Sequence, residues 1–477
     1  MKMIIGGQQV DAKDGKVVEI LNPATNEIID TVPSATVEDV ERALDIAQEG
    51  KKIWADTPLH ERCRILMVFA DLVEKNKEEL AVLLCKETGK AIREARTEIG
   101  GIPNMVRAYA ERAKHLYGSW LSDSHPGTER DIILTRREPL GVVVCVVPFN
   151  FPASSLCHKI APALAMGNSV ICKPPSDNPL NNIRLVELLL EAGVPGSVAQ
   201  ILTGSGAVLG KQLISTPKVN AVSLTGSTEV GVTVTEYASK YLHHVMLELG
   251  GNDALIVFED ADLDLLMKEL LQSRASCAGQ ICSSTKRLLV QNSIKEEVAQ
   301  RLVETLSAIR VGDPMDPETD IGCLISEKAA MEVEKQVQHT IEQGAKCILG
   351  GKRFNGTFFE MTVLVDVTPE MDIAKDMEVF GPVFPIIGFE TLEEAISIAN
   401  ASKYGLMGGV MTKDLDKAMK VAFSLETGGA IINGAGRYRT PDFPFGGCKM
   451  SGIGREGAST TLEEMSQIKS IVLKGVR

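Results

Sequence analysis

Cys282 is the residue whose type and setting in this 477-residue chain best suit nucleophilic chemistry. It follows Gly279-Gln280-Ile281 and precedes the β-rich run Arg287–Gln291. A thiol needs little activation to attack a carbonyl carbon, and a glycine turn beside a helix end presents N–H groups that favour a thiolate and a bound oxyanion. The alternative is a structural thiol, because the chain has ten cysteines and most cysteines are small buried hydrophobes.

Two other segments carry groups that a thiol attacking a carbonyl requires. Glu248 ends the strand-like run Val245–Leu247 and precedes two glycines, so it suits a carboxylate that activates water. Asn150 lies in a proline-flanked turn after the run Val142–Val147, and its neutral amide suits a developing oxyanion. Either residue alone is more typical of a scaffold loop. Together with Cys282 they predict covalent chemistry at a carbonyl carbon.

The apolar pattern predicts an α/β fold with a parallel sheet. From Gly141 onward, short apolar runs alternate with helical segments, as in βαβ units. Such sheets bind ligands at the carboxyl ends of their strands. The expected strands are Val142–Val147, Ser169–Cys172, Val198–Leu202, Val219–Leu224 and Val245–Leu247. The residues that follow these strand ends, and are therefore expected in one cleft, are Lys173, Gly204, Gly226 and Glu248.

Helical signals surround these strands. Thr36 and Asp39 suit a capping box at the start of an amphipathic helix, and a second helical stretch runs from about Leu59 to Glu87. The loop Gly204–Gly210 resembles a dinucleotide fingerprint but misses its spacing by one residue, so an ordinary strand-to-helix turn is the alternative. Gly226–Gly231 also opens a helical pattern, and its backbone suits a phosphate.

Composition excludes several classes of partner. A net charge of −13 and a pI near 5.2 argue against nucleic acid or an anionic membrane surface. No apolar run is long enough for a signal peptide or a membrane span, so a cytoplasmic location is expected. The cysteines show neither CxxC spacing nor histidine partners, so no metal is expected. Cys277 and Cys282 form the one local pair that suits a reversible disulfide.

The motifs resemble those of the NAD(P)-dependent aldehyde dehydrogenase superfamily nearly from end to end. They stand in the family's order: Asn22-Pro-Ala-Thr, Pro148-Phe-Asn-Phe-Pro, Lys159-Ile-Ala-Pro-Ala-Leu-Ala-Met-Gly-Asn, Lys173-Pro-Pro, Thr225-Gly-Ser-Thr-Glu-Val-Gly, Leu247-Glu-Leu-Gly-Gly, Gly279-Gln-Ile-Cys, Glu378-Val-Phe-Gly-Pro-Val and Pro444-Phe-Gly-Gly-Cys-Lys-Met-Ser-Gly. One departure is Ala275-Ser-Cys277, where many relatives carry Phe-x-Asn.

The resemblance implies oxidation of an aldehyde to the carboxylic acid with NAD(P)+. Cys282 would form a thiohemiacetal and then a thioester, Asn150 would hold the oxyanion, Glu248 would activate the hydrolytic water and Lys159 would support the site. Two alternatives are a CoA-acylating relative, which usually lacks a glutamate at position 248, and a non-catalytic nucleotide-binding structural protein, which is expected to have lost Cys282 or Glu248.

The resemblance also implies a cofactor site. Lys173 would bind the adenosine ribose, Glu378 the nicotinamide ribose, and Phe380 would pack by the nicotinamide. NAD-restricted relatives often carry a glutamate at the position of Ser176; without that charge a 2′-phosphate is not repelled, so NADP is expected to be accepted or preferred. The expected cofactor residues are Val147, Pro148, Phe149, Lys173, Ser176, Gly206, Gly210, Ser227, Leu249, Glu378 and Phe380.

The substrate is expected to be a small hydroxylated or acidic aldehyde, of the lactaldehyde, succinic semialdehyde or glyceraldehyde-3-phosphate type. Arg437 and Arg439 lie in the loop that borders the substrate tunnel in the family, and two arginines suit a carboxylate or phosphate. The alternative is a surface salt bridge, for instance with Asp442.

By resemblance, the chain divides into a Rossmann-like NAD(P)-binding domain, an α/β catalytic domain and a β oligomerisation arm. Residues 1–118 and 139–249 would form the first, residues 250–450 the second, and residues 119–138 and 451–477 the arm. The strand-like runs at Ile132 and Ser470 resemble sheet edges that need partners, so a homodimer or homotetramer is expected.

Overall fold

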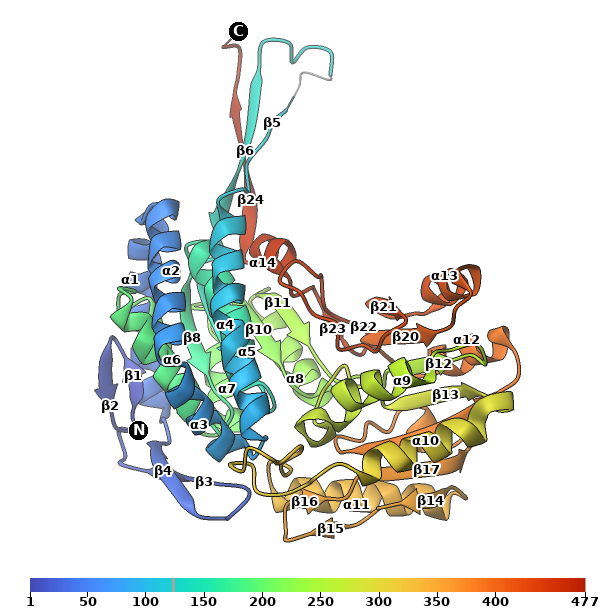
Figure 1. Ribbon diagram of the computed structural model, residues 1–477. Coiled ribbons are helices and arrows are strands. Elements are labelled where there is room, and N and C mark those ends of the chain that lie inside the picture. The colour runs from blue at the N-terminus through green and yellow to red at the C-terminus, as the bar shows by residue number, and fades with distance from the viewer. Residues whose placement is uncertain (122–124, 477) are drawn as a thin grey trace.

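The computed structural model describes residues 1–121 and 125–476 and has the mixed α/β fold that the sequence predicts. Two sheets form the centres of two lobes, and a thin β arm projects from the first lobe and carries the C-terminus near its tip (Figure 1). Within these described residues, no helix is long and apolar enough to cross a membrane.

The first lobe is built on an eight-stranded sheet with the order β2-β1-β9-β8-β7-β10-β11-β23. The strands β7 to β11 are mutually parallel, and β7 (Val-Val-Val-Cys-Val) is almost wholly buried, as expected of a strand covered on both faces. All five predicted strands are present, with shifted ends. The bounds are β1 Met3–Ile5, β2 Gln8–Val10, β7 Val142–Val146, β8 Ser169–Lys173, β9 Ala199–Ile201, β10 Ala221–Thr225, β11 His244–Glu248 and β23 Gly452–Ile453.

Helices cover this sheet (Figure 1). The predicted capping box of Thr36 and Asp39 is present at the start of α1. The single helix expected from Leu59 to Glu87 is wrong: the backbone of Asn76 leaves the helical region, and its side chain donates to the Leu72 carbonyl and ends α2. The bounds are α1 Val37–Asp56, α2 Leu59–Lys75, α3 Lys77–Thr88, α4 Ile92–Ala113, α5 Pro152–Ala165, α6 Leu180–Glu191, α7 Gly206–Ile214, α8 Thr228–Ser239 and α14 Ala458–Glu464.

The second lobe is built on a seven-stranded sheet with the order β14-β17-β18-β13-β12-β20-β21. Its strands are β12 Ala254–Val257, β13 Arg287–Gln291, β14 Lys346–Leu349, β17 Thr362–Val367, β18 Val383–Phe389, β20 Met407–Met411 and β21 Gly429–Ile432. Its helices are α9 Leu263–Leu270, α10 Lys295–Ser307, α11 Glu327–Glu342, α12 Leu392–Asn400 and α13 Leu415–Ser424.

Short pieces complete the lobes. The strand pairs are β3 Val17–Leu21 with β4 Ile28–Pro33, β15 Arg353–Phe354 with β16 Phe358–Phe359, and β19 Tyr404–Gly405 with β22 Cys448–Lys449. The short non-α helices are η1 Leu271–Ala275, η2 Ser276–Gly279, η3 Asn292–Ile294 and η4 Asp372–Ala374.

The arm consists of β5 (Trp120–Leu121), β6 (Ile132–Pro139) and β24 (Ser466–Leu473), with β6 in the middle. The two strand-like runs of the sequence are therefore each other's partners, since β24 pairs antiparallel with β6. The stretch 451–465 lies in the first lobe instead, because β23 pairs with β11 and α14 packs on α4 and α5. The division into functional domains stays a prediction.

A left-handed turn connects η1 to the nucleophile. Cys277, Ala278 and Gly279 have φ values of 53°, 50° and 75°, a conformation that non-glycine residues adopt only at a cost. A Cβ on Gly279 would also lie 2.1 Å from the Gly381 carbonyl oxygen. This position therefore requires glycine for both its dihedral angles and its contact with a neighbouring backbone.

We expect Gly279→Ala to lower the free energy of unfolding by more than the roughly 1–2 kcal/mol of a left-handed alanine, because the backbone clash adds to that cost. Gly100→Ala is the matched control: it lies in α4 with nothing within 4 Å of a built Cβ. An alanine there is expected to add about 0.5–1 kcal/mol. Chemical denaturation of both variants checks this, and equal midpoints would contradict it.

Candidate active site

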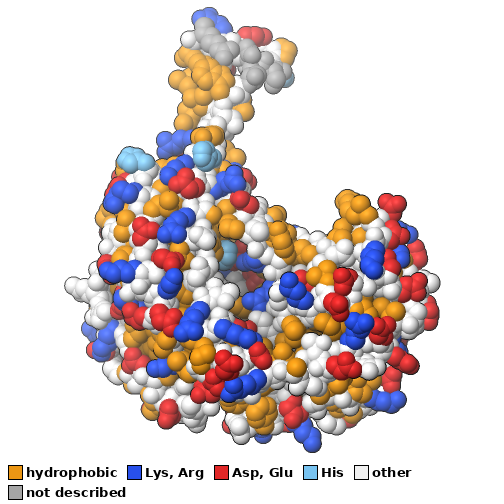
Figure 2. All heavy atoms as spheres, in the orientation of Figure 1, with side chains coloured by type: hydrophobic (Ala, Val, Ile, Leu, Met, Phe, Trp, Pro, Cys, Tyr) orange, Lys and Arg blue, Asp and Glu red, His pale blue; other side chains and the backbone are white. Residues whose placement is uncertain are grey.

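Cys282, Glu248 and Asn150, which come from distant parts of the sequence, line one cavity of about 410 Å³. Residues of α4, α5 and the loop 437–441 complete its wall. The face in Figure 2 is hollowed between the two lobes below the arm. The fold therefore brings together the thiol, the carboxyl group and the amide that the sequence singles out.

The Cys282 thiol and the Glu248 carboxyl lie close enough in this cavity to shift each other's pKa. Burial, followed by the negative charge of Glu456, raises the pKa of Glu248 to about 8. Burial, followed by the Glu248 carboxylate, raises the pKa of the Cys282 thiol well above its ordinary value. One oxygen of Glu248 is buried with no hydrogen-bond partner, and this suits a carboxyl group that acts on a ligand or a water.

Asn150 is buried beside the nucleophile turn. Its side-chain amide donates to the Gln280 carbonyl at 2.7 Å, and its side-chain oxygen accepts from the Phe151 N–H. The buried Lys90 ammonium donates to its backbone carbonyl at 2.8 Å and is paired with buried Glu98. The turn that carries the amide is thus fixed from both sides.

A chain of ion pairs borders the cavity. The buried Lys159 ammonium donates to Thr225 Oγ1 at 2.7 Å and lies 3.3 Å from Glu456, whose other oxygen is 3.0 Å from Arg439. Burial opposes ionisation of Glu456, but Lys159 and the other cations around it outweigh burial and hold its pKa at about 2. Glu456 is a carboxylate at all ordinary pH values, and its charge disfavours ionisation of Glu248.

The expected nucleotide residues gather at the carboxyl ends of the first sheet. Lys173 ends β8, and its ammonium donates to the Pro174 carbonyl and to the Ser176 hydroxyl at 3.1 Å. Burial lowers the pKa of Lys173 to about 8. Gly206 begins α7 beside this ammonium, and Ser227 caps α8. The remaining expected positions follow the same strand ends or lie in the helices after them: Val147, Pro148, Phe149, Gly210 and Leu249.

Glu378 and Phe380 come from the loop before β18. The Phe380 ring packs edge-on against Phe149 at 5.9 Å between centroids. Glu378 accepts from the Gly251 N–H and pairs with buried Lys286 at 3.0 Å. A Cβ on Gly250 would lie 2.4 Å from the second Glu378 oxygen, so this glycine provides the space for the carboxylate.

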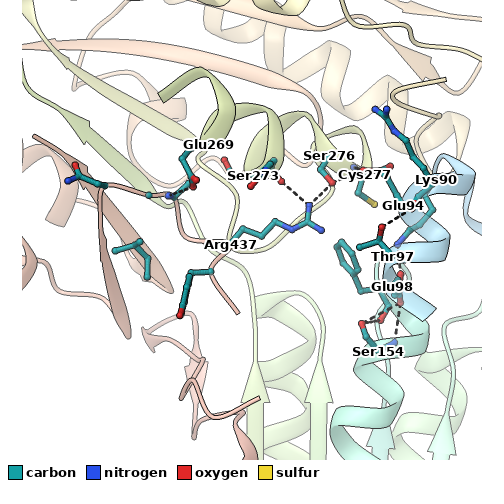
Figure 3. Close-up of a pocket in the computed structure, with 18 of the residues that line it drawn as sticks. Lys90, Glu94, Thr97, Glu98, Ser154, Glu269, Ser273, Ser276, Cys277 and Arg437 are labelled. Carbon is teal, nitrogen blue, oxygen red and sulfur yellow. Dashed lines mark hydrogen bonds and ion pairs between the residues drawn. The ribbon is translucent and has the colours of Figure 1, made fainter. Parts of the chain in front are cut away.

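Arg437 separates the catalytic cavity from a second cavity of about 850 Å³. Its guanidinium lies over the Phe151 ring and donates to Ser276 Oγ and the Gln272 carbonyl. Figure 3 shows Arg437 pointing to Ser276, with Cys277 and Glu94 beyond it.

The suggested partner of the two arginines is wrong. Asp442 pairs with Arg112 at 2.7 Å, because Arg439 points instead to Glu456 and stacks over the Phe445 ring at 3.8 Å. Both Arg437 and Arg439 line the catalytic cavity.

Comparison with known proteins identifies the family. The family model described as "Aldehyde dehydrogenase family" matches residues 10–471. A 3-sulfolactaldehyde dehydrogenase of Priestia megaterium is 40% identical over 457 residues, which cover 96% of this chain and 94% of the relative. A lactaldehyde dehydrogenase of Methanocaldococcus jannaschii is 38% identical over 478 residues, which cover 99% of this chain and 100% of the relative.

Solved structures agree. The glyceraldehyde-3-phosphate dehydrogenase GapN of Methanocaldococcus jannaschii, complexed with NADP, matches with a TM-score of 0.92 and 38% identity over 96% of this chain and 99% of that one. An NADP-dependent enzyme of Escherichia coli matches with a TM-score of 0.96 and 35% identity over 99% of this chain and 98% of that one. The chain belongs to the aldehyde dehydrogenase family. It is an NAD(P)-dependent enzyme that oxidises an aldehyde to the acid.

Two charged residues of this aldehyde dehydrogenase site were not predicted. Glu456 lies 17 residues after Arg439 and outside every motif that the sequence singled out. Lys286 had a signal: Lys286-Arg287 directly precede an apolar run, and the structure buries both. Two cationic side chains at the start of a buried strand are rare unless each is paired with other groups of the protein.

We expect alkylation to distinguish the two cysteines of the nucleophile turn. Burial raises the pKa of both thiols, so exposure decides: Cys282 is partly exposed and lines the catalytic cavity, whereas Cys277 is 4% exposed. Iodoacetamide at pH 8 should therefore modify Cys282 several-fold faster, as measured by peptide mass spectrometry. The Cys277→Ser variant should be modified at the wild-type rate at Cys282; faster labelling of Cys277 would contradict the geometry.

Proposed function

We propose that this enzyme oxidises a small hydroxylated or acidic aldehyde of the lactaldehyde, succinic semialdehyde or glyceraldehyde-3-phosphate type. The observation that carries the proposal is the pair Arg437 and Arg439, which come from one loop and both line the cavity of Cys282. Guanidinium groups suit a carboxylate, phosphate or sulfonate. The relatives named for 3-sulfolactaldehyde, lactaldehyde and succinate semialdehyde support a short polar substrate.

Cys282 is proposed as the nucleophile. Its thiolate attacks the aldehyde carbon and forms a thiohemiacetal, and the oxyanion accepts hydrogen bonds from the Asn150 amide and the Cys282 N–H. The Asn150 amide must exchange its bond to the Gln280 carbonyl for this role. NAD(P)+, when bound, supplies the hydride acceptor that turns the thiohemiacetal into a thioester.

Glu248 is proposed as the base of the second half-reaction. Its carboxylate takes a proton from a water that attacks the thioester carbon, and the acid and the free thiol of Cys282 are released. Lys159 supports the site by keeping Glu456 ionised and in place. The presence of Glu248 argues against the CoA-acylating alternative.

The cofactor is proposed to lie across the strand ends. The buried Lys173 ammonium, which donates to two neutral acceptors, suits the hydroxyls of the adenosine ribose, and Glu378 suits those of the nicotinamide ribose. Ser176 places a hydroxyl rather than a carboxylate beside Lys173, so a 2′-phosphate meets no fixed negative charge from position 176. We therefore propose that NADP is accepted as a cofactor.

Two further proposals concern the setting of the enzyme. The arm leaves Ile468, Val472 and Trp120 exposed on outer strands, which supports a homodimer or homotetramer in which another copy covers them. We also propose a cytoplasmic location, which the acidic composition supports.

We expect Glu248→Gln to retain a burst of reduced cofactor and to slow steady-state turnover at least tenfold, because the amide cannot activate water. Rapid-quench and steady-state absorbance measurements separate the two phases. A wild-type turnover rate would rule out this residue as the base.

We expect Arg439→Met to lower the preference for anionic over neutral aldehydes. The loss of a hydrogen-bonded charge is worth about 1.5–3 kcal/mol, so the ratio of kcat/KM for succinic semialdehyde to that for propanal should fall roughly tenfold to a hundredfold. Steady-state kinetics with a panel of aldehydes that also includes lactaldehyde and glyceraldehyde-3-phosphate, run with both cofactors, measures this ratio.

Arg112→Met is the control, because Arg112 pairs with Asp442 outside the cavity. An unchanged ratio in Arg439→Met would contradict the substrate assignment.

The same panel tests the cofactor. A kcat/KM for NAD at least a hundredfold above that for NADP would contradict the proposed use of NADP.

A further inference from the structure

Lys286 connects the nucleophile to the loop that carries Glu378. It lies four residues after Cys282, directly before β13, and its side chain is 1% exposed. Its ammonium donates a hydrogen bond to the Cys282 backbone carbonyl and lies 3.0 Å from Glu378 Oε1. A buried ammonium retains its charge only where such partners surround it.

The Glu378 carboxylate has contacts besides its ion pair with Lys286. The oxygen that pairs with Lys286 also accepts from the Gly251 N–H at 3.1 Å, and the second oxygen lies against Gly250. These glycines follow Glu248 after one residue, Leu249. The Lys286–Glu378 pair thus ties together the Cys282 turn, the Glu248 turn and the loop before β18.

The charges around the thiol give this pair an electrostatic role. Burial and the Glu248 carboxylate disfavour the Cys282 thiolate, whereas Lys286 and, more weakly, Arg439 favour it. Lys286 in turn faces two carboxyl groups, Glu378 and Asp253. Burial raises the pKa of Asp253 to about 7 although Lys286 opposes this, so Glu378 is the stronger counter-charge of the lysine.

We propose that Lys286 is a positioning residue: it fixes the Cys282 backbone, presents a positive charge to the thiol, and links both to Glu378. The inference rests on the proposed roles of Cys282 and Glu378. It implies that the charge acting on the nucleophile depends on a carboxylate that the cofactor ribose would engage. Neutralising Glu378 should therefore strengthen the effect of Lys286, and neutralising Lys286 should remove it.

The test is the pH profile of Cys282 alkylation in the full-length enzyme without cofactor, read by iodoacetamide and peptide mass spectrometry. In Lys286→Met we expect the midpoint to rise by about one pH unit, a tenfold loss of thiolate at a given pH, because an opposite charge has been removed. Lys286→Arg should return the midpoint most of the way to its wild-type value. Lys90→Met is the matched control, because Lys90 is equally buried but is paired with Glu98 and is not among the charges that act most strongly on the Cys282 thiol. An unshifted midpoint in Lys286→Met overturns the inference.

Glu378→Gln keeps the inference testable if Lys286→Met does not fold, since Glu378 is less buried than Lys286, with 19% of its side chain exposed against 1%. Its midpoint should move to lower pH, and no movement overturns the inference. In steady state, Lys286→Met should lose kcat and Lys286→Arg should regain it, which a purely structural role does not predict. Failure of the proposed function is distinguishable: Cys282→Ser would then still oxidise aldehydes, whatever the alkylation profiles show.

Discussion

The Cys282 thiol and the Glu248 carboxyl share one cavity, and the negative charge of Glu248 opposes ionisation of the thiol. In such a pair the two protons are lost in two steps, and the pKa of each step is a property of the pair rather than of one residue. The proposed reaction needs these charges in sequence rather than together: a thiolate first, a carboxylate later. Once the thiol has become a neutral thioester, ionisation of Glu248 no longer competes with a thiolate, so the base becomes available after the nucleophile has been used.

The cations of the site are placed to make this alternation possible. Lys286 lies on the nucleophile side, and Lys159 and Arg439 lie below Glu248 around Glu456. Glu456 is held ionised and raises the pKa of Glu248, so it favours the protonated base while the thiolate forms. Breaking a buried network of this kind lowers the stability of the fold strongly, because removing one member leaves the charge of its partner uncompensated.

Some of this could be predicted from the sequence, for identifiable reasons. The β-branched runs of the first sheet reveal their strands because a doubly covered strand is apolar throughout, and Arg287–Gln291 is a strand as predicted. The break at Asn76 was missed because the apolar pattern continues across it, while a local side-chain bond ends the helix. The left-handed turn at Cys277 and Ala278 was also not predicted, because neither residue favours that conformation by itself.

The sequence by itself determined the types of chemical group and the local backbone that carries them: a thiol after a glycine turn, a carboxyl at a strand end and an amide between prolines. Their types and settings also predicted that they act together. Only the tertiary structure decided which charges face them. Glu456, Lys286 and Arg439 lie far from at least one of their partners in the chain, and Arg439 pairs with Glu456 rather than nearby Asp442. Electrostatic interactions depend on distance and burial, and neither can be read from spacing along a sequence.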